Sequence, residues 1–420
     1  MRILWFSITA SLYDNKRNRH NGGGWVESLE RIVKISNNVE LAIAFEHPSA
    51  LFKDEIDGVT YYPINVGRSR MQNLKRHFTI ADEEKLLLPH CMKIIDDYKP
   101  DIIQCFGSEW CFGLVAQHTT IPVVIHMQGS MPSYFNALYP PRYNKWTKLG
   151  YALSRLKIKD FCLSLFQEKR NRQRAEREKR ILSSNAYFMG RTDWDKSIVK
   201  LFSPKSQYYI CNEALRTSFY ESKERWQPKN RDKVVLCTVG SGSLWKGIDV
   251  ILKTAHILTE SGILDFEWRL IGGMHSRQYI EYIEKIKFAD VNATFVGVLQ
   301  EDQLKQELTG CDIYVHPAYI DNSPNSLCEA MIMGVPCIAS YVGGIPSLIE
   351  DGAEGKLVPA NEPYYLAQQI IDLAHDKKTQ RRYSDNGRTK ALGRHDPDLI
   401  KRQLLSIYAT ITKHSHEKNH

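Results

Sequence analysis

Residues that could carry chemistry are most concentrated between Ile313 and Gly355. There an apolar run is followed by a polar loop with Asp321 and then by a segment that contains Glu329. A carboxylate such as Glu329 can accept both hydroxyls of a ribose, and free N–H groups at Asn325 and Ser326 can meet a phosphate at a helix start. Loop, capping and core roles explain each residue singly, but they explain the whole set less readily.

Three other positions suit contacts with a ligand, and each has a plainer alternative. Gly22, Gly23 and Gly24 precede a helical run, so their backbone can approach a phosphate or sugar, with a flexible turn as the alternative. Lys246 follows a glycine-containing loop that is not a complete P-loop, and a solvated lysine is the alternative. His126 ends an apolar run that predicts a strand, and a titratable side chain at the carboxyl end of a strand can contact a ligand. A hydrogen-bonded structural histidine is the alternative.

The elements that must position these residues are short apolar strands that alternate with amphipathic helical segments. Strands are expected at residues 3–8, 39–45, 102–105, 123–126, 186–189, 208–211, 234–239, 268–271, 293–296, 313–316, 337–339 and 356–358. Buried strands that alternate with helices predict an α/β fold with parallel sheets covered on both faces. Ligands of such sheets bind outside the carboxyl ends of the strands.

Strands and helices alternate in two successive series, which predicts two doubly wound domains. The polar stretch 212–233 precedes an apolar strand and indicates the boundary. We therefore expect an N-terminal Rossmann-like domain over residues 1–210 and a C-terminal one over 211–395. Residues 396–420 are expected to form a helix and tail that pack back toward the N-terminal domain.

Composition excludes several classes of protein. The 420 residues are 43% hydrophobic and 25% charged, which is typical of globular domains rather than collagen-like, disordered or coiled-coil chains. No apolar stretch is long enough to predict a membrane span, and no signal peptide is expected. The nine cysteines show no zinc-ligand spacing, so buried thiols in a reducing cytosol are expected.

The stretch that contains Asp321 and Glu329 resembles the donor-site signature of retaining GT-B glycosyltransferases of family four, the glycosyl transferases group 1. That signature places an acidic residue before a Glu-Ala pair, followed by Gly-x-Pro-x-Ile and a Gly-Gly turn. The matching residues here are Asp321, Glu329, Ala330, Gly334, Pro336, Ile338, Gly343 and Gly344. Lys246 with Gly247, the strand end at Gly272 and Gly273, and the Phe295–Gly297 segment match further family motifs.

The resemblance implies a GT-B fold, with two Rossmann-like domains facing each other across a cleft, and a nucleotide diphosphate sugar as donor. It makes the domain over 1–210 the acceptor domain and the domain over 211–395 the donor domain. It also implies retention of configuration without a metal or other cofactor, with the departing phosphate helping to deprotonate the acceptor hydroxyl. Catalytic roles would fall to His126, Asp321 and Glu329. Donor-binding roles would fall to Gly23, Gly24, Lys246, Gly272, Gly273, Val298, Asn325, Ser326 and Glu329.

Two positions depart from the family pattern. Asp321 stands where the family has a glutamate, so the carboxylate that would contact the donor sugar is one methylene shorter. An arginine that often precedes the lysine is replaced by Gly240 or Ser241, and Arg191 is a candidate to supply that charge from across the cleft.

An Asp-x-Asp sequence at Asp193 and Asp195 spells the metal signature of a different glycosyltransferase fold. Both residues fall at the start of an expected helix, where acidic side chains cap the free N–H groups. We therefore expect capping, and no metal ligands.

The segment 141–180 carries the excess charge of the chain. It holds 13 basic and four acidic residues, a net charge of +9, whereas the whole chain carries +8. Trp146, Leu149, Leu153 and Leu156 recur at helical spacing, which suits an amphipathic helix on an anionic membrane surface. A helix packed on the core is the alternative, and no nucleic-acid module accompanies the charge.

These features predict an enzyme that transfers a hexose or N-acetylhexosamine from a nucleotide diphosphate sugar to a hydroxyl of a glycan or lipid-linked acceptor. Surface polysaccharide biosynthesis at the inner face of the cytoplasmic membrane is the expected setting. The alternatives are a sugar-nucleotide epimerase with the same fold and a nucleotide-sugar-binding protein without turnover.

Overall fold

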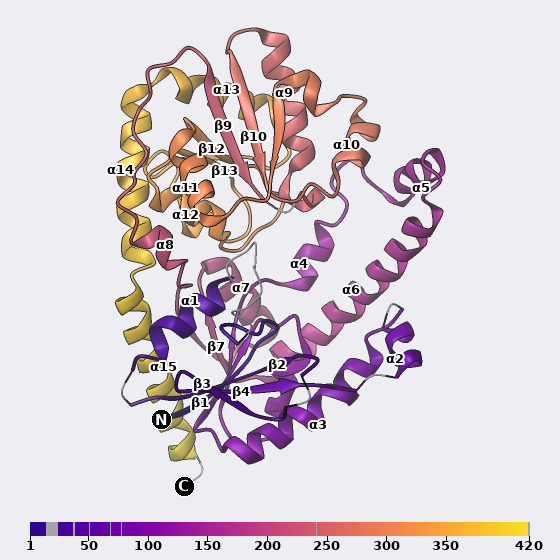
Figure 1. The fold of residues 1–420 in the computed structure, drawn as a ribbon, viewed down its shortest axis with the longest axis vertical. Coiled ribbons are helices and arrows are strands. Elements are labelled where there is room, and N and C mark those ends of the chain that lie inside the picture. The colour runs from indigo at the N-terminus through magenta and orange to yellow at the C-terminus, as the bar shows by residue number, and fades with distance from the viewer. Residues whose placement is uncertain are drawn as a thin grey trace. The chain divides into compact units, whose positions relative to one another are not determined.

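The computed structural model describes residues 1–13, 24–36, 38–49, 51–67, 69–76, 78–240 and 242–418. The chain divides into two compact units, each assembled from segments that are distant in the sequence. Unit 1 contains Met1–Phe135, Cys162–Ala214 and His395–His420, and unit 2 contains Asn136–Phe161 and Leu215–Arg394 (Figure 1). Within the described ranges, no helix combines the length and the apolar character needed to cross a bilayer.

Unit 1 is built on an eight-stranded sheet in the order β3-β4-β2-β1-β5-β6-β7-β8. Its strands pair in parallel, except for the antiparallel pair of β3 with β4. The strands are β1 (Arg2–Phe6), β2 (Glu40–Glu46), β3 (Asp54–Ile56), β4 (Val59–Ile64), β5 (Ile102–Phe106), β6 (Val123–His126), β7 (Tyr187–Gly190) and β8 (Gln207–Ile210).

Alternate side chains of β1 enter two different apolar clusters, so helices cover both faces of this sheet. Leu4 and Phe6 pack in the cluster that includes α3 (Ala81–Tyr98), and Ile3 and Trp5 pack in the cluster that includes α1 (Gly24–Val33) and α15 (Pro397–Lys418). This two-sided burial is why the strands read as continuous apolar runs rather than alternating ones.

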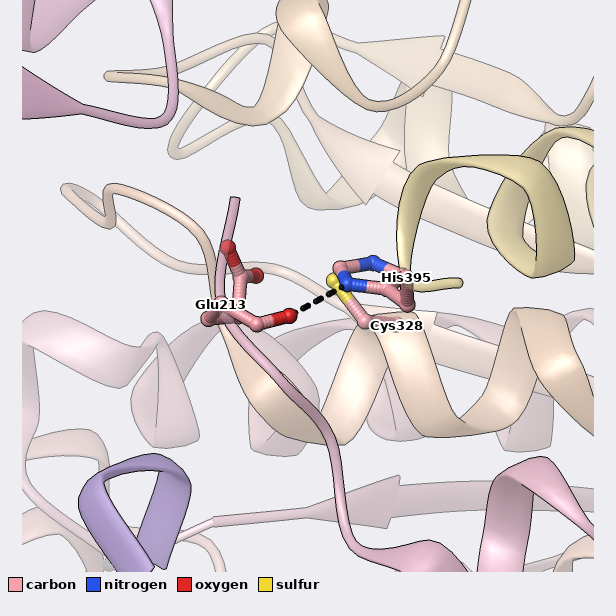
Figure 2. Close-up of side chains that lie close together, drawn as sticks. All are labelled: Glu213, Cys328 and His395. Carbon is pink, nitrogen blue, oxygen red and sulfur yellow. Dashed lines mark hydrogen bonds between the residues drawn. The ribbon is translucent and has the colours of Figure 1, made fainter. Parts of the chain in front are cut away.

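The C-terminal helix α15 is part of unit 1. It buries Ile400, Leu404 and Tyr408, which are four residues apart and so lie on one helical face. The Trp5 indole of β1 donates a hydrogen bond to the Tyr408 hydroxyl over 3.0 Å. Before this helix, His395 Nδ1 donates to the backbone oxygen of Glu213 over 3.0 Å, which joins the two points where the chain leaves and re-enters unit 1 (Figure 2).

Unit 2 is built on a six-stranded sheet in the order β11-β10-β9-β12-β13-β14, and all of its pairs are parallel. The strands are β9 (Val234–Val239), β10 (Phe266–Ile271), β11 (Ala293–Gly297), β12 (Ile313–His316), β13 (Cys337–Ser340) and β14 (Lys356–Val358). Val234 and Leu236 pack in the cluster of α9 (Ile248–Ser261) and α13 (Pro363–His375). Val235 and Cys237 pack in the cluster of α12 (Asn325–Ile332) on the other face. Two parallel sheets with helices on both faces confirm the predicted α/β fold.

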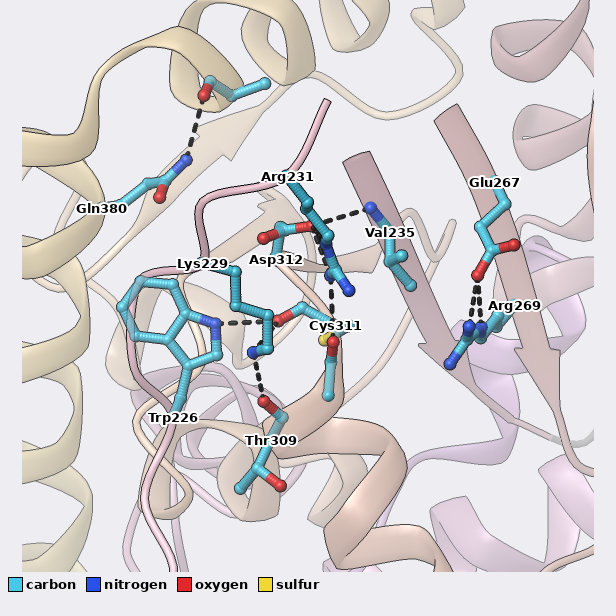
Figure 3. Close-up of polar contacts among 12 residues, drawn as sticks. Trp226, Lys229, Arg231, Val235, Glu267, Arg269, Thr309, Cys311, Asp312 and Gln380 are labelled. Carbon is cyan, nitrogen blue, oxygen red and sulfur yellow. Dashed lines mark hydrogen bonds and ion pairs between the residues drawn. The ribbon is translucent and has the colours of Figure 1, made fainter. Parts of the chain in front are cut away.

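Residues 215–233 of the polar stretch expected at the boundary belong to unit 2 (Figure 3). The Trp226 indole donates to the carbonyl oxygen of Cys311 over 2.8 Å. Arg231 Nε donates over 2.9 Å to Asp312 Oδ2, which also accepts the N–H of Val235 over 2.8 Å. The charged residues of this stretch therefore fix the start of β9 against the end of α11 (Glu301–Gly310).

Residues 136–161 correct the expected domain boundaries. They were expected within an N-terminal domain over 1–210, but they group with unit 2. Helix α5 (Lys145–Ser154) begins at a capping box of Asn144, and before it Arg142 and Tyr143 bind Glu284, at the end of α10 (Arg277–Glu284), over 2.6 and 2.8 Å. These charged and aromatic contacts hold the start of the basic segment 141–180 in unit 2. Helix α6 (Ile158–Ser184) continues into unit 1.

Candidate active site

The candidate site of unit 2 lies where its strand order reverses. Strands β9 and β12 are neighbours in the sheet, but successive crossovers lead away from them in opposite directions. Crevices outside the carboxyl ends of such a strand pair are where doubly wound sheets bind ligands. Lys246 follows β9 and Asp321 follows β12, so the topology brings these two predicted residues together.

Asp321 is the centre of a charged group. Its Oδ2 lies 2.5 Å from Lys246 Nζ and 2.9 Å from His316 Nε2, and its Oδ1 accepts the N–H of Asn322 over 3.1 Å. Burial disfavours the charged form of Asp321 and raises its pKa. The contacts with Lys246 and His316 have the larger effect and hold the pKa of Asp321 well below its usual range. Asp321 is therefore ionised at neutral pH.

Two glycines with positive φ permit the loops around Asp321 to touch. A Cβ on Gly343, at φ 52°, would lie 1.8 Å from the backbone oxygen of Asp321. A Cβ on Gly247, at φ 74°, would lie 1.8 Å from the oxygen of Pro317. Only glycine fits either contact, so these motif residues allow the loops to pack against each other.

Glu329 lies in the second turn of α12 and is 3% exposed. Arg216 donates two hydrogen bonds to the carboxylate of Glu329, from Nε over 2.7 Å and from Nη2 over 2.6 Å. Burial raises the pKa of Glu329, and Arg216 opposes that rise. Sequence reasoning missed Arg216 because it is far from Glu329 in the chain, and its position in a charged boundary segment was the available signal.

The start of α12 carries the predicted Asn325 and Ser326. Pro324 occupies the N-cap position, and Asn325 is the first helical residue. The carbonyl of Pro324 accepts the N–H groups of Leu327 and Cys328 over 3.0 and 3.1 Å. Asn325 and Ser326 come before the first residues that make these bonds, so their N–H groups have no acceptor within the helix. Such N–H groups can bind a phosphate at a helix start.

The other predicted donor-binding residues of unit 2 follow neighbouring strands. Gly272 and Gly273 follow β10, and the N–H of Gly272 donates to the oxygen of Gly297 over 2.7 Å. Val298 follows β11 and is 51% exposed. All three stand at the same edge of the sheet as Lys246, since parallel strands end together.

Residues 220–390 match the family model of glycosyl transferases group 1. The chain is similar to this family over these residues. Lys246, Asp321 and Glu329 lie within the matched residues, and Arg216 lies just before them.

The chain is similar to curated relatives over part of its length. It is 29% identical over 174 residues to a putative colanic acid biosynthesis glycosyltransferase of Salmonella typhimurium, a match that covers 40% of this chain and 42% of the relative. It is 25% identical over 195 residues to a diacetylbacillosaminyl-diphospho-undecaprenol N-acetylgalactosaminyltransferase of Campylobacter jejuni, covering 46% and 50%. The chain therefore spans about half the length of these relatives.

Solved structures match nearly the whole chain. Sucrose-phosphate synthase from Thermosynechococcus elongatus superposes with a TM-score of 0.72 at 15% identity, covering 98% of this chain and 99% of that one. Anabaena HepE, solved in complex with UDP-glucose, superposes with a TM-score of 0.64 at 13% identity, covering 98% and 100%. At such identity the likeness shows the fold, and it confirms the predicted GT-B class.

In unit 1, His126 is fully buried. It is 0% exposed, its Nε2 lies 3.1 Å from the oxygen of Cys211, and its Nδ1 lies 3.4 Å from Gln104 Nε2. Burial and the charge of Arg191 lower the pKa of His126 to about 3. These contacts fit the alternative of a hydrogen-bonded structural histidine, and the catalytic role of His126 stays a prediction.

Other predictions for unit 1 have mixed outcomes. Gly24 begins α1, and Gly23 lies outside the described residues, as does Ser241 of unit 2. Arg191 Nη2 donates to the oxygen of Gln128 over 2.9 Å, so its guanidinium is engaged within unit 1. Asp195 closes a capping box with Thr192 at the start of α7 (Asp193–Phe202), which confirms the predicted capping role.

Proposed function

We propose that the enzyme transfers a hexose or N-acetylhexosamine from a nucleotide diphosphate sugar to a hydroxyl of a glycan or lipid-linked acceptor, with retention of configuration. The observation that carries this proposal is the meeting of Lys246, Asp321 and the start of α12 at the strand-order reversal of unit 2. The UDP-glucose complex of the similarly folded HepE supports a nucleotide sugar as the donor.

The positive charge of the candidate site suits a reaction in which a diphosphate is the leaving group. Cleavage of the sugar–phosphate bond builds negative charge on the leaving group, which Lys246 and the N–H groups of Asn325 and Ser326 would stabilise. An ammonium has three donors, so Lys246 can bind Asp321 and a phosphate at once. Asp321 would face the donor sugar, and Glu329, held in place by Arg216, would accept the ribose hydroxyls.

Retention would follow without a protein base. His126 is neutral and enclosed in unit 1, so the departing phosphate is the group left to take the proton of the acceptor hydroxyl. Acceptor recognition would fall to unit 1. The printed name of the Campylobacter jejuni relative, which includes a diphospho-undecaprenol, supports a lipid-linked acceptor.

A panel of labelled nucleotide sugars tests this function against its alternatives. Transfer requires a product that forms only when an acceptor is present. An epimerase would yield product from the donor alone. A binding protein would retain the nucleotide sugar without turnover, and either result would contradict the proposal.

A metal-independent reaction is expected. Activity in excess chelator should match activity without it, because Lys246 and the start of α12 supply the positive charge that a metal would otherwise provide. Transfer assays with and without EDTA make the measurement. Complete loss of activity that manganese or magnesium restores would contradict the proposed mechanism.

The turn between α5 and α6 supports attachment to the inner face of the cytoplasmic membrane. All residues from 153 to 160 are exposed, and Leu156 is 90% exposed in the left-handed region at φ 55°. Apolar Leu153, Leu156 and Ile158 alternate with basic residues here. Apolar side chains that insert and cations that meet anionic headgroups are the pattern of a membrane-surface anchor. Assembly of a surface polysaccharide fits this location and the name of the Salmonella typhimurium relative.

Co-sedimentation with vesicles tests the attachment. Binding should require anionic lipid, fall with salt, and fall about tenfold or more when Arg155, Lys157 and Lys159 become glutamine, at roughly 1 kcal/mol for each basic residue. The matched control changes the exposed Lys377, Lys378 and Arg381 of α14 (Lys377–Arg394) to glutamine and should leave binding intact. Equal sedimentation with neutral and anionic vesicles, or none with either, would make a soluble acceptor the better proposal.

A further inference from the structure

Unit 1 contains a cavity of about 330 Å³ that no part of the proposed donor site uses. Its walls include Ile8, which follows β1, and Trp110, which follows β5. These two strands are neighbours at the point where the strand order of unit 1 reverses. The cavity therefore holds the position in unit 1 at which a doubly wound sheet binds its ligand, and its volume is that of a small-molecule pocket.

Three arginines line this cavity. Arg170 and Arg174 come from one face of α6, four residues apart, and Arg76 follows α2 (Arg70–Lys75). Glu46 and Glu83 are the acidic residues of the wall. Glu83 is shared, because it accepts from Arg177 over 2.8 Å as well as from Arg174 over 3.4 Å. The wall of the cavity therefore holds three arginines and two carboxylates, and one of these carboxylates also pairs with Arg177.

The guanidinium groups are only partly satisfied by the protein. Arg170 Nη1 donates to the backbone oxygen of Arg76 over 2.7 Å, and the Arg174 guanidinium lies 4.7 Å from the centre of the Trp110 ring. Nε of Arg170 and Nε of Arg174 are buried and, among the described residues, have no hydrogen-bond acceptor. In that same part of the chain, Arg76 has no ion-pair partner. Buried donors without acceptors are costly unless a ligand supplies the acceptors.

Electrostatics favour an anion in the same place. Burial lowers the pKa of Arg170, and the neighbouring charges of Arg174 and Arg76 lower it further. Like charges held together in a partly buried cavity repel one another, and an anion between them removes that repulsion. Arginine is also the side chain whose fork of donors matches the oxygens of a phosphate.

We propose that this cavity binds a phosphate group carried by the acceptor substrate. The proposal rests on the proposed function in one respect, because it assigns unit 1 to the acceptor. Arg76, Arg170 and Arg174 would hold the phosphate oxygens, and the apolar walls at Ile8 and Trp110 would contact the group attached to the phosphate. A phosphorylated lipid headgroup and a soluble sugar phosphate share this chemistry.

Trp110 provides a local probe. In the full-length protein labelled with 5-fluorotryptophan, the ¹⁹F resonance of Trp110 is the one lost in Trp110→Phe. Inorganic phosphate should shift this resonance saturably. The midpoint should rise about tenfold or more in the double variant Arg170→Gln/Arg174→Gln, which removes two charge-assisted contacts. Lys169→Gln, on the same helix but exposed, is the matched control and should leave the midpoint unchanged.

A second variant guards against loss of folding. Arg76→Gln removes no ion pair among the described residues, so it should keep the circular dichroism spectrum and still weaken phosphate binding. A Trp110 resonance that phosphate does not move, or a midpoint unchanged in both variants, would overturn the proposal.

Two arms of the titration distinguish the sources of the phosphate. Glucose 1-phosphate without membranes represents the soluble source, and vesicles that contain phosphatidate represent the lipid source. A shift in either arm that the arginine variants weaken supports the site. Binding of nucleotide sugars is measured in parallel. If donors bind and turn over but phosphate does not shift the Trp110 resonance, only this inference is contradicted. If no donor binds, the proposed function is contradicted instead.

Discussion

Replacing Lys246 by alanine should lower kcat/KM for the donor by about 100- to 1000-fold, the usual cost of removing one group that stabilises charge in a transition state. The effect should exceed that of an ordinary lysine for a structural reason. Lys246 also neutralises Asp321, which is buried and ionised. Without the ammonium, a carboxylate would face the diphosphate and repel it. Steady-state kinetics and donor calorimetry make the measurement.

Two further variants sharpen this test. Lys305→Ala on α11 removes a lysine that pairs only with the exposed Asp302 among the described residues, and it should keep full activity. Lys246→Ala/Asp321→Asn removes the repulsion as well as the cation, so it should bind the donor more tightly than Lys246→Ala alone. Normal turnover by Lys246→Ala would place the phosphate clamp elsewhere.

Glu329 and Arg216 should behave as a coupled pair. Glu329→Gln should weaken donor binding by about 10- to 100-fold, because a hydrogen bond to a charged group contributes roughly 1.5–3 kcal/mol. Arg216→Ala should cost about 3–5 kcal/mol of unfolding free energy, since it leaves a buried carboxylate without its partner. Calorimetry with the donor and urea unfolding measure the two effects. Unchanged donor affinity in Glu329→Gln would remove this residue from the site.

The pH dependence of the Arg216→Ala variant gives an independent check. Burial already raises the pKa of Glu329, and loss of Arg216 should raise it further. A carboxyl with a raised folded-state pKa stabilises the fold below its unfolded pKa and loses that contribution as pH rises through the folded value. The variant should therefore recover stability relative to the wild type on acidification. Glu329→Gln/Arg216→Ala, which has no carboxyl here, should not.

The sequence predicted the parallel strands well because they are buried on both faces. The strands expected at 123–126, 234–239, 313–316 and 356–358 have the observed bounds. The β3–β4 hairpin was missed. Its second strand contains Pro63, which lowers the strand signal, although Asp57-Gly58 is a strong hairpin turn and both residues have positive φ.

The site was predictable where its residues are close in the sequence. Asp321, Asn325 and Glu329 fall on one loop and helix, so spacing alone arranged them. Arg216 and the cavity arginines of α6 depend on contacts between distant segments, which no local pattern encodes. The burial of His126 was not predictable in this way, because a strand end indicates position but does not tell whether the ring is covered.

The contacts of residues 136–161 bear on how this protein can be dissected. A fragment cut to residues 215–394 would contain every strand of unit 2 but would lack Arg142 and Tyr143. Glu284, which is 8% exposed and accepts from both, would then lose two of its partners. Unit 2 is thus not a continuous module that gene fusion could move intact. Under the proposed function, an exchange of donor specificity between homologous chains would have to include the α5 segment.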